Sequence, residues 1–261
     1  MKERFRSFSK RVVALTGASE LCWVVLASVN STNSLARRLG QRYSGLPKKP
    51  ARTVVIAWSQ ESGRGRGDRH WESRGGEGVW ASILLPVVAR DTLALLPLIA
   101  GVALAEVVQG HLRSKVRLKW PNDLYVGDAK LGGILVEGMS RGESASAVVG
   151  FGINHGLHPP EFETRTTTSM QLEPGSHPPL ADFAVSLANS VDTAIDRALP
   201  SRKLMERIRK LSMHQNGDAI ELTTAAGPVS GLFRSIDEQG LLVLETERGV
   251  ERLAAGEIVH R

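Results

Sequence analysis

The residues with the most chemistry in this sequence form a short run of glycine and arginine. Residues 63–71 read Gly-Arg-Gly-Arg-Gly-Asp-Arg-His-Trp. Glycine lets the backbone approach a ligand closely, and arginine offers a planar, permanently charged fork that matches carboxylate or phosphate. The run therefore predicts a loop that binds an anion. An arginine- and glycine-rich segment can also bind RNA or be mobile, and this run alone favours neither interpretation.

A second group of polar residues flanks a predicted hairpin turn. Residues 119–123 read Lys-Trp-Pro-Asn-Asp, and residues 130–134 read Lys-Leu-Gly-Gly-Ile. An ammonium at the start of a buried strand, with glycines that leave room for a ligand, can neutralise charge on an attacked phosphate. Lys130 is therefore the best catalytic candidate, although most lysines after such a turn are exposed. Asn122 and Asp123 could be turn formers only.

Short polar side chains also lie where a strand pattern meets a helix pattern. Asn30, Ser31, Thr32 and Asn33 join these two segments, and Gln60 ends a later strand. Such residues commonly cap a helix, and a glutamine at a strand end is often merely exposed. The same hydroxyl and amide groups could instead bond a small polar ring at the helix N-terminus.

Composition limits the classes of protein that fit. With 261 residues and 42% apolar residues, the chain can bury one substantial core and a small second domain. Its net charge of +6 favours anionic ligands without identifying one. Cys22 is the only cysteine, which excludes an internal disulfide and a cysteine-built metal site and fits a reducing, cytoplasmic location.

The N-terminus imitates a signal peptide, because a basic segment at 2–11 precedes a mildly apolar one at 12–27. Glycine, serine and glutamate interrupt the apolar part, so we reject that interpretation. The apolar run at 93–108 is shorter than the ~20 residues that a membrane span needs, and no membrane association is expected.

Hydrophobic periodicity predicts a mixed domain followed by a small β domain. Strands are expected at 22–29, 53–58, 78–85, 115–120, 124–126, 134–137 and 147–151, and helices at 32–41, 92–110, 180–198 and 201–215. Long loops are expected at 59–78 and 156–179. Short alternating segments at 218–223, 228–236, 240–245, 249–253 and 257–260 predict a small β-barrel. We therefore expect domains at 1–215 and 216–261.

Taken together, five segments resemble the biotin protein ligase family in order and spacing. They are Ser31-Thr32-Asn33, the glycine-arginine loop ending in Arg69-x-Trp71, residues 119–123, Lys130-Leu131-x-Gly133-Ile134-Leu135-Val136-Glu137 and Gly150-x-Gly152-Ile153-Asn154. The resemblance covers roughly residues 22–157, and the C-terminal segment matches the family only by pattern. It implies an α+β catalytic domain of the class II aminoacyl-tRNA synthetase and biotin ligase type, with a largely antiparallel sheet, plus a Src-homology-3-type barrel.

The resemblance implies a reaction as well. Biotin and ATP, with Mg²⁺, would form biotinyl-5'-AMP and pyrophosphate, and biotin would pass to a lysine of the biotin carboxyl carrier domain of acetyl-CoA, acyl-CoA or pyruvate carboxylase. Only about twenty residues precede the first strand, so no N-terminal DNA-binding domain and no DNA partner are expected. Homodimerisation through an exposed strand is common in the family.

Individual roles follow from the same resemblance. Biotin is expected at Ser31, Thr32, Asn33, Gln60, Gly63, Arg64, Gly65, Arg66, Lys130 and Gly133. The nucleotide is expected at Arg66, Arg69, Trp71, Lys119, Asn122, Lys130 and Asn154. Lys130, Arg66 and Arg64 are the expected catalytic residues, with both arginines facing the biotin carboxylate and the ATP phosphates. The resemblance also implies that Asp123 is a magnesium ligand or lies next to one.

Three residues depart from the family pattern. Asp68 stands where the family commonly has glycine, Gly67 where it often has a larger residue, and Asn30 where it usually has aspartate. The glycine-arginine loop, which is mobile when empty and closes over ligand in the family, could therefore close differently here.

Two alternatives compete with this hypothesis. A lipoyl or octanoyl ligase of the same superfamily would need a long apolar acyl channel, whereas the arginine loop and the Ser-Thr-Asn cluster favour a polar ureido head. An RNA-binding protein would leave both lysine motifs unexplained, and no aromatic ladder for stacking bases accompanies the loop.

Overall fold

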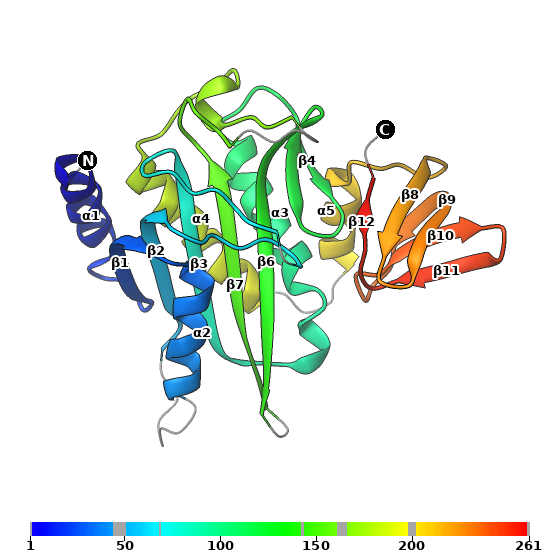
Figure 1. Ribbon diagram of the computed structural model, residues 1–261, viewed down its shortest axis with the longest axis horizontal. Helices are drawn as coiled ribbons and strands as arrows, with labels where there is room; N and C mark the ends of the chain where they lie inside the picture. The colour runs from blue at the N-terminus through cyan, green and yellow to red at the C-terminus, as the bar shows by residue number, and fades with distance from the viewer. Residues whose placement is uncertain are drawn as a thin grey trace.

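The computed structural model describes residues 2–43, 51–67, 69–141, 144–160, 166–197 and 202–259. Its large sheet has seven strands in the order β1-β2-β3-β7-β6-β5-β4 (Figure 1). They are β1 (Cys22–Val29), β2 (Thr53–Gln60), β3 (Gly78–Val88), β4 (Val116–Lys119), β5 (Asp123–Val126), β6 (Ala129–Arg141) and β7 (Ser144–Asn154). Only β1 and β2 pair in parallel among these neighbours, and the others are antiparallel. The predicted α+β class with a largely antiparallel sheet is confirmed.

The two faces of this sheet carry different helices. Neighbouring strand residues point to opposite faces. Val54 and Ile56 therefore belong to the core around α3 (Leu96–Gln109), whereas Val55 packs with the smaller cluster under α2 (Thr32–Tyr43). Figure 1 shows α2 in front of the sheet, with α3 and α4 (Leu180–Arg197) behind it.

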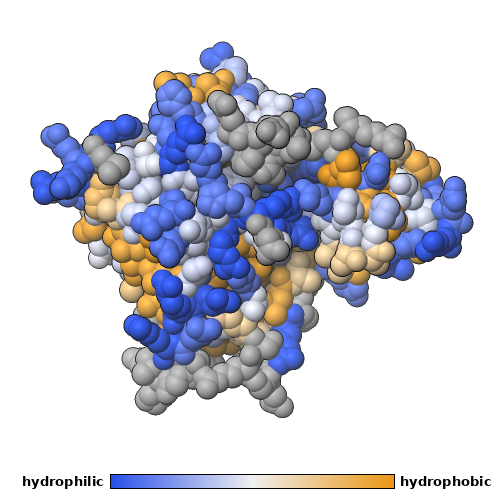
Figure 2. Space-filling view, in the orientation of Figure 1, coloured by the Kyte–Doolittle hydropathy of each residue, from blue (hydrophilic) through white to orange (hydrophobic). Residues whose placement is uncertain are grey.

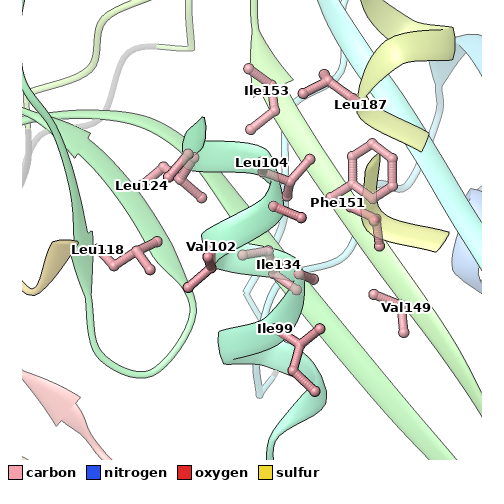
Figure 3. Packing of buried hydrophobic residues seen from close by; sticks show 14 of the residues in the cluster. Ile99, Val102, Leu104, Leu118, Leu124, Ile134, Val149, Phe151, Ile153 and Leu187 are labelled. Atoms are coloured by element: carbon pink, nitrogen blue, oxygen red, sulfur yellow. The ribbon is translucent and has the colours of Figure 1, made fainter. Parts of the chain in front are cut away.

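Helix α3 is the centre of the main core. It is apolar nearly all round, as expected of a helix covered on both sides. Figure 3 shows Ile99 and Leu104 of α3 among Leu118, Ile134 and Phe151, which come from strands of the large sheet. In the part of the chain that the structure describes, no helix is long and apolar enough to cross a membrane.

The helix α1 (Lys2–Thr16) is an addition to the elements that periodicity predicts. Its buried residues are Phe8 and Val12, four positions apart and so on one helix face. Phe8 packs edge-on against Trp58 with 5.4 Å between ring centroids, and Arg11 pairs with Asp182 of α4 at 2.5 Å. Tertiary contacts of this kind hold in place a helix whose sequence mixes basic and apolar residues.

Several helices and strands also begin or end at residues other than those predicted. Helix α3 starts at Leu96 because residues 90–92 form a separate 3-10 turn, and α5 (Arg202–Leu211) ends earlier than predicted. Strands β6 and β7 are much longer than predicted, because their pairing continues beyond the apolar stretch.

The C-terminal sheet consists of β8 (Ala219–Thr224), β9 (Gly227–Ile236), β10 (Leu242–Thr246), β11 (Gly249–Leu253) and β12 (Glu257–Ile258). Its order is β11-β10-β9-β8-β12, so the predicted barrel is not confirmed: within the described residues the sheet is open, with β11 and β12 at its edges. Alternation predicts strands but not closure, which requires the two edge strands to meet. The last predicted strand residue, at position 260, lies outside the described residues.

Two hydrogen bonds tie the C-terminal sheet to the rest of the chain near the large sheet. Trp120 Nε1 donates to the Gly240 carbonyl at 3.0 Å, and Arg66 Nη1 donates to the Gly256 carbonyl at 3.1 Å. The second of these reaches the glycine-arginine loop, so the C-terminal sheet borders the predicted site.

Candidate active site

A cavity lies beneath the glycine-arginine loop, between the start of α2 and strands β6 and β7. It measures about 640 Å³ when its open mouth is included. Thirteen predicted site residues line it: Ser31, Thr32, Asn33, Gln60, Arg64, Gly65, Arg66, Arg69, Trp71, Asn122, Asp123, Lys130 and Gly133. On the face seen in Figure 2, hydrophilic residues gather at the junction of the large sheet and the C-terminal sheet.

Lys130 is buried rather than exposed on the hairpin. It lies near the start of β6 with 5% of its surface exposed, and its Nζ is 2.5 Å from Asp123 Oδ2. The ammonium also lies 5.3 Å from the centroid of the Trp71 ring. A buried cation is tolerated only when it is paired in this way. A β-carbon at Gly133 would come within 3.1 Å of Asp123 Oδ1, so glycine keeps this wall of the cavity open.

A buried hydrogen-bonded cluster forms the floor of the cavity. The Thr32 N–H and hydroxyl both donate to Gln60 Oε1, at 2.8 and 3.1 Å, and Gln60 Nε2 donates to Ser73 Oγ at 2.7 Å. Ser82 Oγ lies 2.8 Å from Thr32 Oγ1 and 2.6 Å from Asn33 Oδ1. These bonds hold the hydroxyl and amide groups in fixed orientations before any ligand binds.

Asn33 lines the cavity, but protein groups occupy its polar atoms. Its Nδ2 donates to the Leu135 carbonyl at 3.1 Å and to Glu137 Oε2 at 2.9 Å, and its Oδ1 faces Ser82. Asn33 thus ties the first turn of α2 to β6. Its expected contact with biotin stays a prediction.

The glycine-arginine loop folds back on itself over the cavity. Gly65 N donates to the Arg69 carbonyl at 2.8 Å, and Trp71 N donates to the Gly63 carbonyl at 2.9 Å. A β-carbon at Gly63 would lie 2.1 Å from the Trp71 carbonyl oxygen, so this close pairing requires glycine. Gly67 has a φ of +64°, a left-handed conformation that suits glycine. The departure at Asp68 lies outside the described residues.

The three arginines of the loop have different partners. Arg64 Nη1 donates to both oxygens of Glu137, at 2.9 and 3.1 Å, and Arg69 forms an ion pair with Glu257 of β12. Arg66 donates to two neutral oxygens, Asn122 Oδ1 at 3.3 Å and the Gly256 carbonyl at 3.1 Å.

The electrostatic setting of Arg66 differs accordingly. Burial lowers the pKa of its guanidinium, and the positive charge of Arg69 lowers the pKa further. Arginine remains charged in proteins, so the lowered pKa describes a cation short of negative charge. Such a group gains most when a ligand brings an anion beside it.

Three predicted residues do not line the cavity: Gly63, Lys119 and Asn154. Lys119 is buried at the end of β4, with its Nζ 5.6 Å from the centroid of the Tyr125 ring. Asn154 ends β7 and donates from Nδ2 to the Thr168 carbonyl at 2.9 Å. In the described part of the chain, the buried atoms Asn154 Oδ1 and Trp71 Nε1 have no hydrogen-bond partner. An unpaired buried polar atom is costly, so each of these two atoms would gain from a hydrogen-bond partner.

Four side chains that do not line the cavity but contact the predicted site residues carry no predicted role: Ser73, Ser82, Glu137 and Glu257. The sequence could have indicated Ser82, because a hydroxyl inside the apolar strand 78–88 must find a buried hydrogen-bond partner. The sequence indication for Glu137 was weaker: it is a carboxylate at the end of the otherwise apolar segment 134–137. Glu257 had none, because its contact with Arg69 joins residues 188 positions apart.

This arrangement defines a class of protein: an α+β protein in which a buried lysine and an arginine loop line a cavity suited to a small ligand with an anionic group. Residues 25–154 match the Biotin/lipoate A/B protein ligase family, and residues 217–261 match the Biotin protein ligase C terminal domain. The chain belongs to the biotin protein ligase family.

Known relatives are similar over most of the chain. The bifunctional ligase/repressor BirA of Escherichia coli (strain K12) is 32% identical over 240 residues, covering 90% of this chain and 72% of the relative. The biotin--[acetyl-CoA-carboxylase] ligase of Mycobacterium tuberculosis is 30% identical over 245 residues, covering 90% and 88%. The biotin protein ligase from Aquifex aeolicus in complex with biotin and ATP has a TM-score of 0.74 at 24% identity, covering 92% and 98%. That structure shares the fold.

The position of Asn33 leads us to predict that a substitution at Gly150 of β7 destabilises the protein. A β-carbon there would lie 1.8 Å from Asn33 Oδ1, so Gly150→Ala must displace the amide that ties α2 to β6. We expect a loss of about 1–3 kcal/mol in the free energy of unfolding, measured by urea denaturation. Gly138→Ala is the control, because its β-carbon would meet its nearest atoms at an ordinary 3.7 Å. Equal stability of the two variants would show that Asn33 does not occupy this position.

Proposed function

We propose that this protein activates biotin with ATP to form biotinyl-5'-AMP and then transfers biotin to a lysine of a biotin carboxyl carrier domain. The observation that carries the proposal is the buried Lys130, which faces a cavity covered by the arginine loop and floored by the Thr32–Gln60 cluster. A small ligand with a polar head at one end and a carboxylate at the other matches these two ends of the cavity.

The chemistry of the first step explains the positive charge. The biotin carboxylate attacks the α-phosphate of ATP, the new C–O–P bond forms, and the bond to the β-phosphate breaks to release pyrophosphate. Two anions must approach each other, so catalysis consists largely of positioning and charge neutralisation. Lys130 and Arg66 supply this charge at the cavity wall.

In the second step, an amine of the carrier attacks the acyl carbon of biotinyl-5'-AMP. An amide forms as the amine loses a proton, and AMP leaves with the electrons of the broken acyl C–O bond. Water would compete for the same carbon, so the folded glycine-arginine loop has to cover the intermediate. The bonds between residues 63–65 and 69–71 give the loop a defined shape for that purpose.

The two ligands would divide the predicted site residues between them. Biotin would lie at Ser31, Thr32, Asn33, Gln60, Gly65 and Gly133, with the backbone of Gly63 to Arg66 above it. The nucleotide would lie at Arg66, Trp71, Asn122 and Asn154, with Arg69 and Lys119 at its margin. The unpaired Trp71 Nε1 and Asn154 Oδ1 support a ligand on this side of Lys130.

Magnesium would enter with the ATP phosphates and help to neutralise them. The residues in the described ranges include no group of three or more His, Cys, Asp or Glu placed to hold a metal ion. Mg²⁺ is often held by only one or two carboxylates together with substrate phosphates. Asp123 is the residue that would hold the ion beside the phosphates, and its Oδ2 already pairs with Lys130.

The acceptor would be the carrier domain of acetyl-CoA, acyl-CoA or pyruvate carboxylase, and the Mycobacterium tuberculosis relative is named for the first of these. A cytoplasmic location is consistent with the single Cys22. Homodimerisation and a domain division at residues 215/216 stay predictions.

Lys130→Ala should abolish formation of biotinyl-5'-AMP, because no other ammonium lines the described cavity. Arg66→Ala should slow it by about 10²-fold or more, the scale for losing one preorganised charge stabiliser. Biotin-dependent release of pyrophosphate measures both effects. Near-normal turnover by Lys130→Ala would remove this residue from the mechanism.

Substrate choice separates biotin ligation from lipoate ligation. The purified protein is incubated with ATP, Mg²⁺, a biotin carrier domain and equal amounts of labelled biotin and lipoate. We expect biotin on the carrier and little lipoate, because the floor of the cavity is a polar cluster rather than an apolar channel. Preferential transfer of lipoate would overturn the proposal, and the family model alone would allow that result.

A further inference from the structure

The glycine-arginine loop is attached to the rest of the protein on both sides of Arg66. Arg64, on one side, pairs with Glu137 of β6, and Arg69, on the other, pairs with Glu257 of β12. The two carboxylates come from different sheets. Arg66, between them, forms no ion pair with a carboxylate among the described residues and donates to two neutral oxygens.

Glu137 is the anchor on the large sheet. Its side chain is 17% exposed, and it accepts hydrogen bonds from Arg64 and from Asn33 Nδ2. The same carboxylate therefore contacts the loop above the cavity and the first turn of α2 at its floor. Movement of the loop away from the cavity would break the bond to Arg64 and leave Glu137 with less compensation for its partly buried charge.

Glu257 is the anchor on the C-terminal sheet. It lies on the short edge strand β12, next to Gly256, whose carbonyl accepts from Arg66 at 3.1 Å. Arg69 also donates from Nε to the Arg66 carbonyl at 3.1 Å. A β-carbon at Gly256 would meet Leu222 Cδ2 at 2.6 Å, so β12 is packed closely against β8 and is held in place by its own sheet.

We propose that Glu137 and Glu257 are positioning residues that hold the loop over the cavity from two sides and direct Arg66 toward the reacting anions. This inference rests on the proposed function. Arg64 and Arg69 then serve as anchors, and the C-terminal sheet contributes to the active site through Glu257 and Gly256. Both ion pairs are partly exposed, so each is weak and sensitive to salt, and the loop can open to admit substrates.

A charge exchange distinguishes an anchor from a residue that binds phosphate. Glu257→Arg and Arg69→Glu should each speed the escape of biotinyl-5'-AMP from the protein by ~fivefold, the factor that corresponds to losing one such pair. The double variant restores the pair with reversed charges, and escape should return to within about twofold of the original rate. If Arg69 instead binds phosphate, the double variant will stay as impaired as Arg69→Glu alone, and the proposal will be overturned.

Glu137 is tested separately with Glu137→Gln, which removes the charge but keeps an oxygen that can accept from Asn33. We expect a rise of similar size in adenylate escape and in the KM for biotin, with kcat for adenylate formation changed less. A fall in kcat with KM and escape unchanged would contradict a positioning role. Glu245→Gln is the control, because it removes an Arg–carboxylate pair with Arg234 elsewhere in the C-terminal sheet.

Hydrogen exchange of the ligand-free protein gives a readout that needs no activity. The Gly65 and Trp71 amides are bonded within the loop and report its opening. Glu257→Gln should speed their exchange, while Glu245→Gln should not. Unchanged exchange in Glu257→Gln would contradict the anchor. If the unaltered protein forms no adenylate, the proposed function fails, while this exchange still tests the attachment.

Discussion

The burial of the Lys130 charge is the constraint around which the site is arranged. An ammonium with 5% exposure must be compensated, and Asp123 does so at 2.5 Å while the ring of Trp71 covers it. Asp123 lies on β5, Lys130 on β6 and Trp71 on the loop. The contacts of the Lys130 charge therefore fix the position of the β5–β6 hairpin relative to the glycine-arginine loop above it.

The positively charged side chains at the site differ in how far carboxylate partners already neutralise them. A cation with a carboxylate partner is neutralised before substrate arrives, as Arg64 and Arg69 are. Arg66 is partly desolvated and bonded to neutral oxygens, so it can offer more to an incoming anion. Lys130 combines both properties, because it is paired with Asp123 and also lines the cavity. The loop thus contains two kinds of arginine that their sequence context does not distinguish.

The sequence predicted the local chemistry better than the long-range contacts. Residues 63–71, 119–123 and 130–134 each predicted part of one anion site, and the structure brings most of them to one cavity. Periodicity predicted the large sheet, but it could not find α1, which depends on contacts with Trp58 and Asp182. It also predicted a barrel where the sheet is open, because alternation is the same in both. The carboxylates at 137 and 257 acquire their roles only when the chain folds.

The most direct test of this account is a crystal structure of the protein with a non-hydrolysable analogue of biotinyl-5'-AMP. We expect Lys130 Nζ to lie within hydrogen-bond distance of the acyl-phosphate linkage and Arg66 to contact the phosphate. Arg64 and Arg69 should remain on Glu137 and Glu257. A ligand bound outside this cavity, or one bound there with Lys130 contacting Asp123 alone, would contradict it.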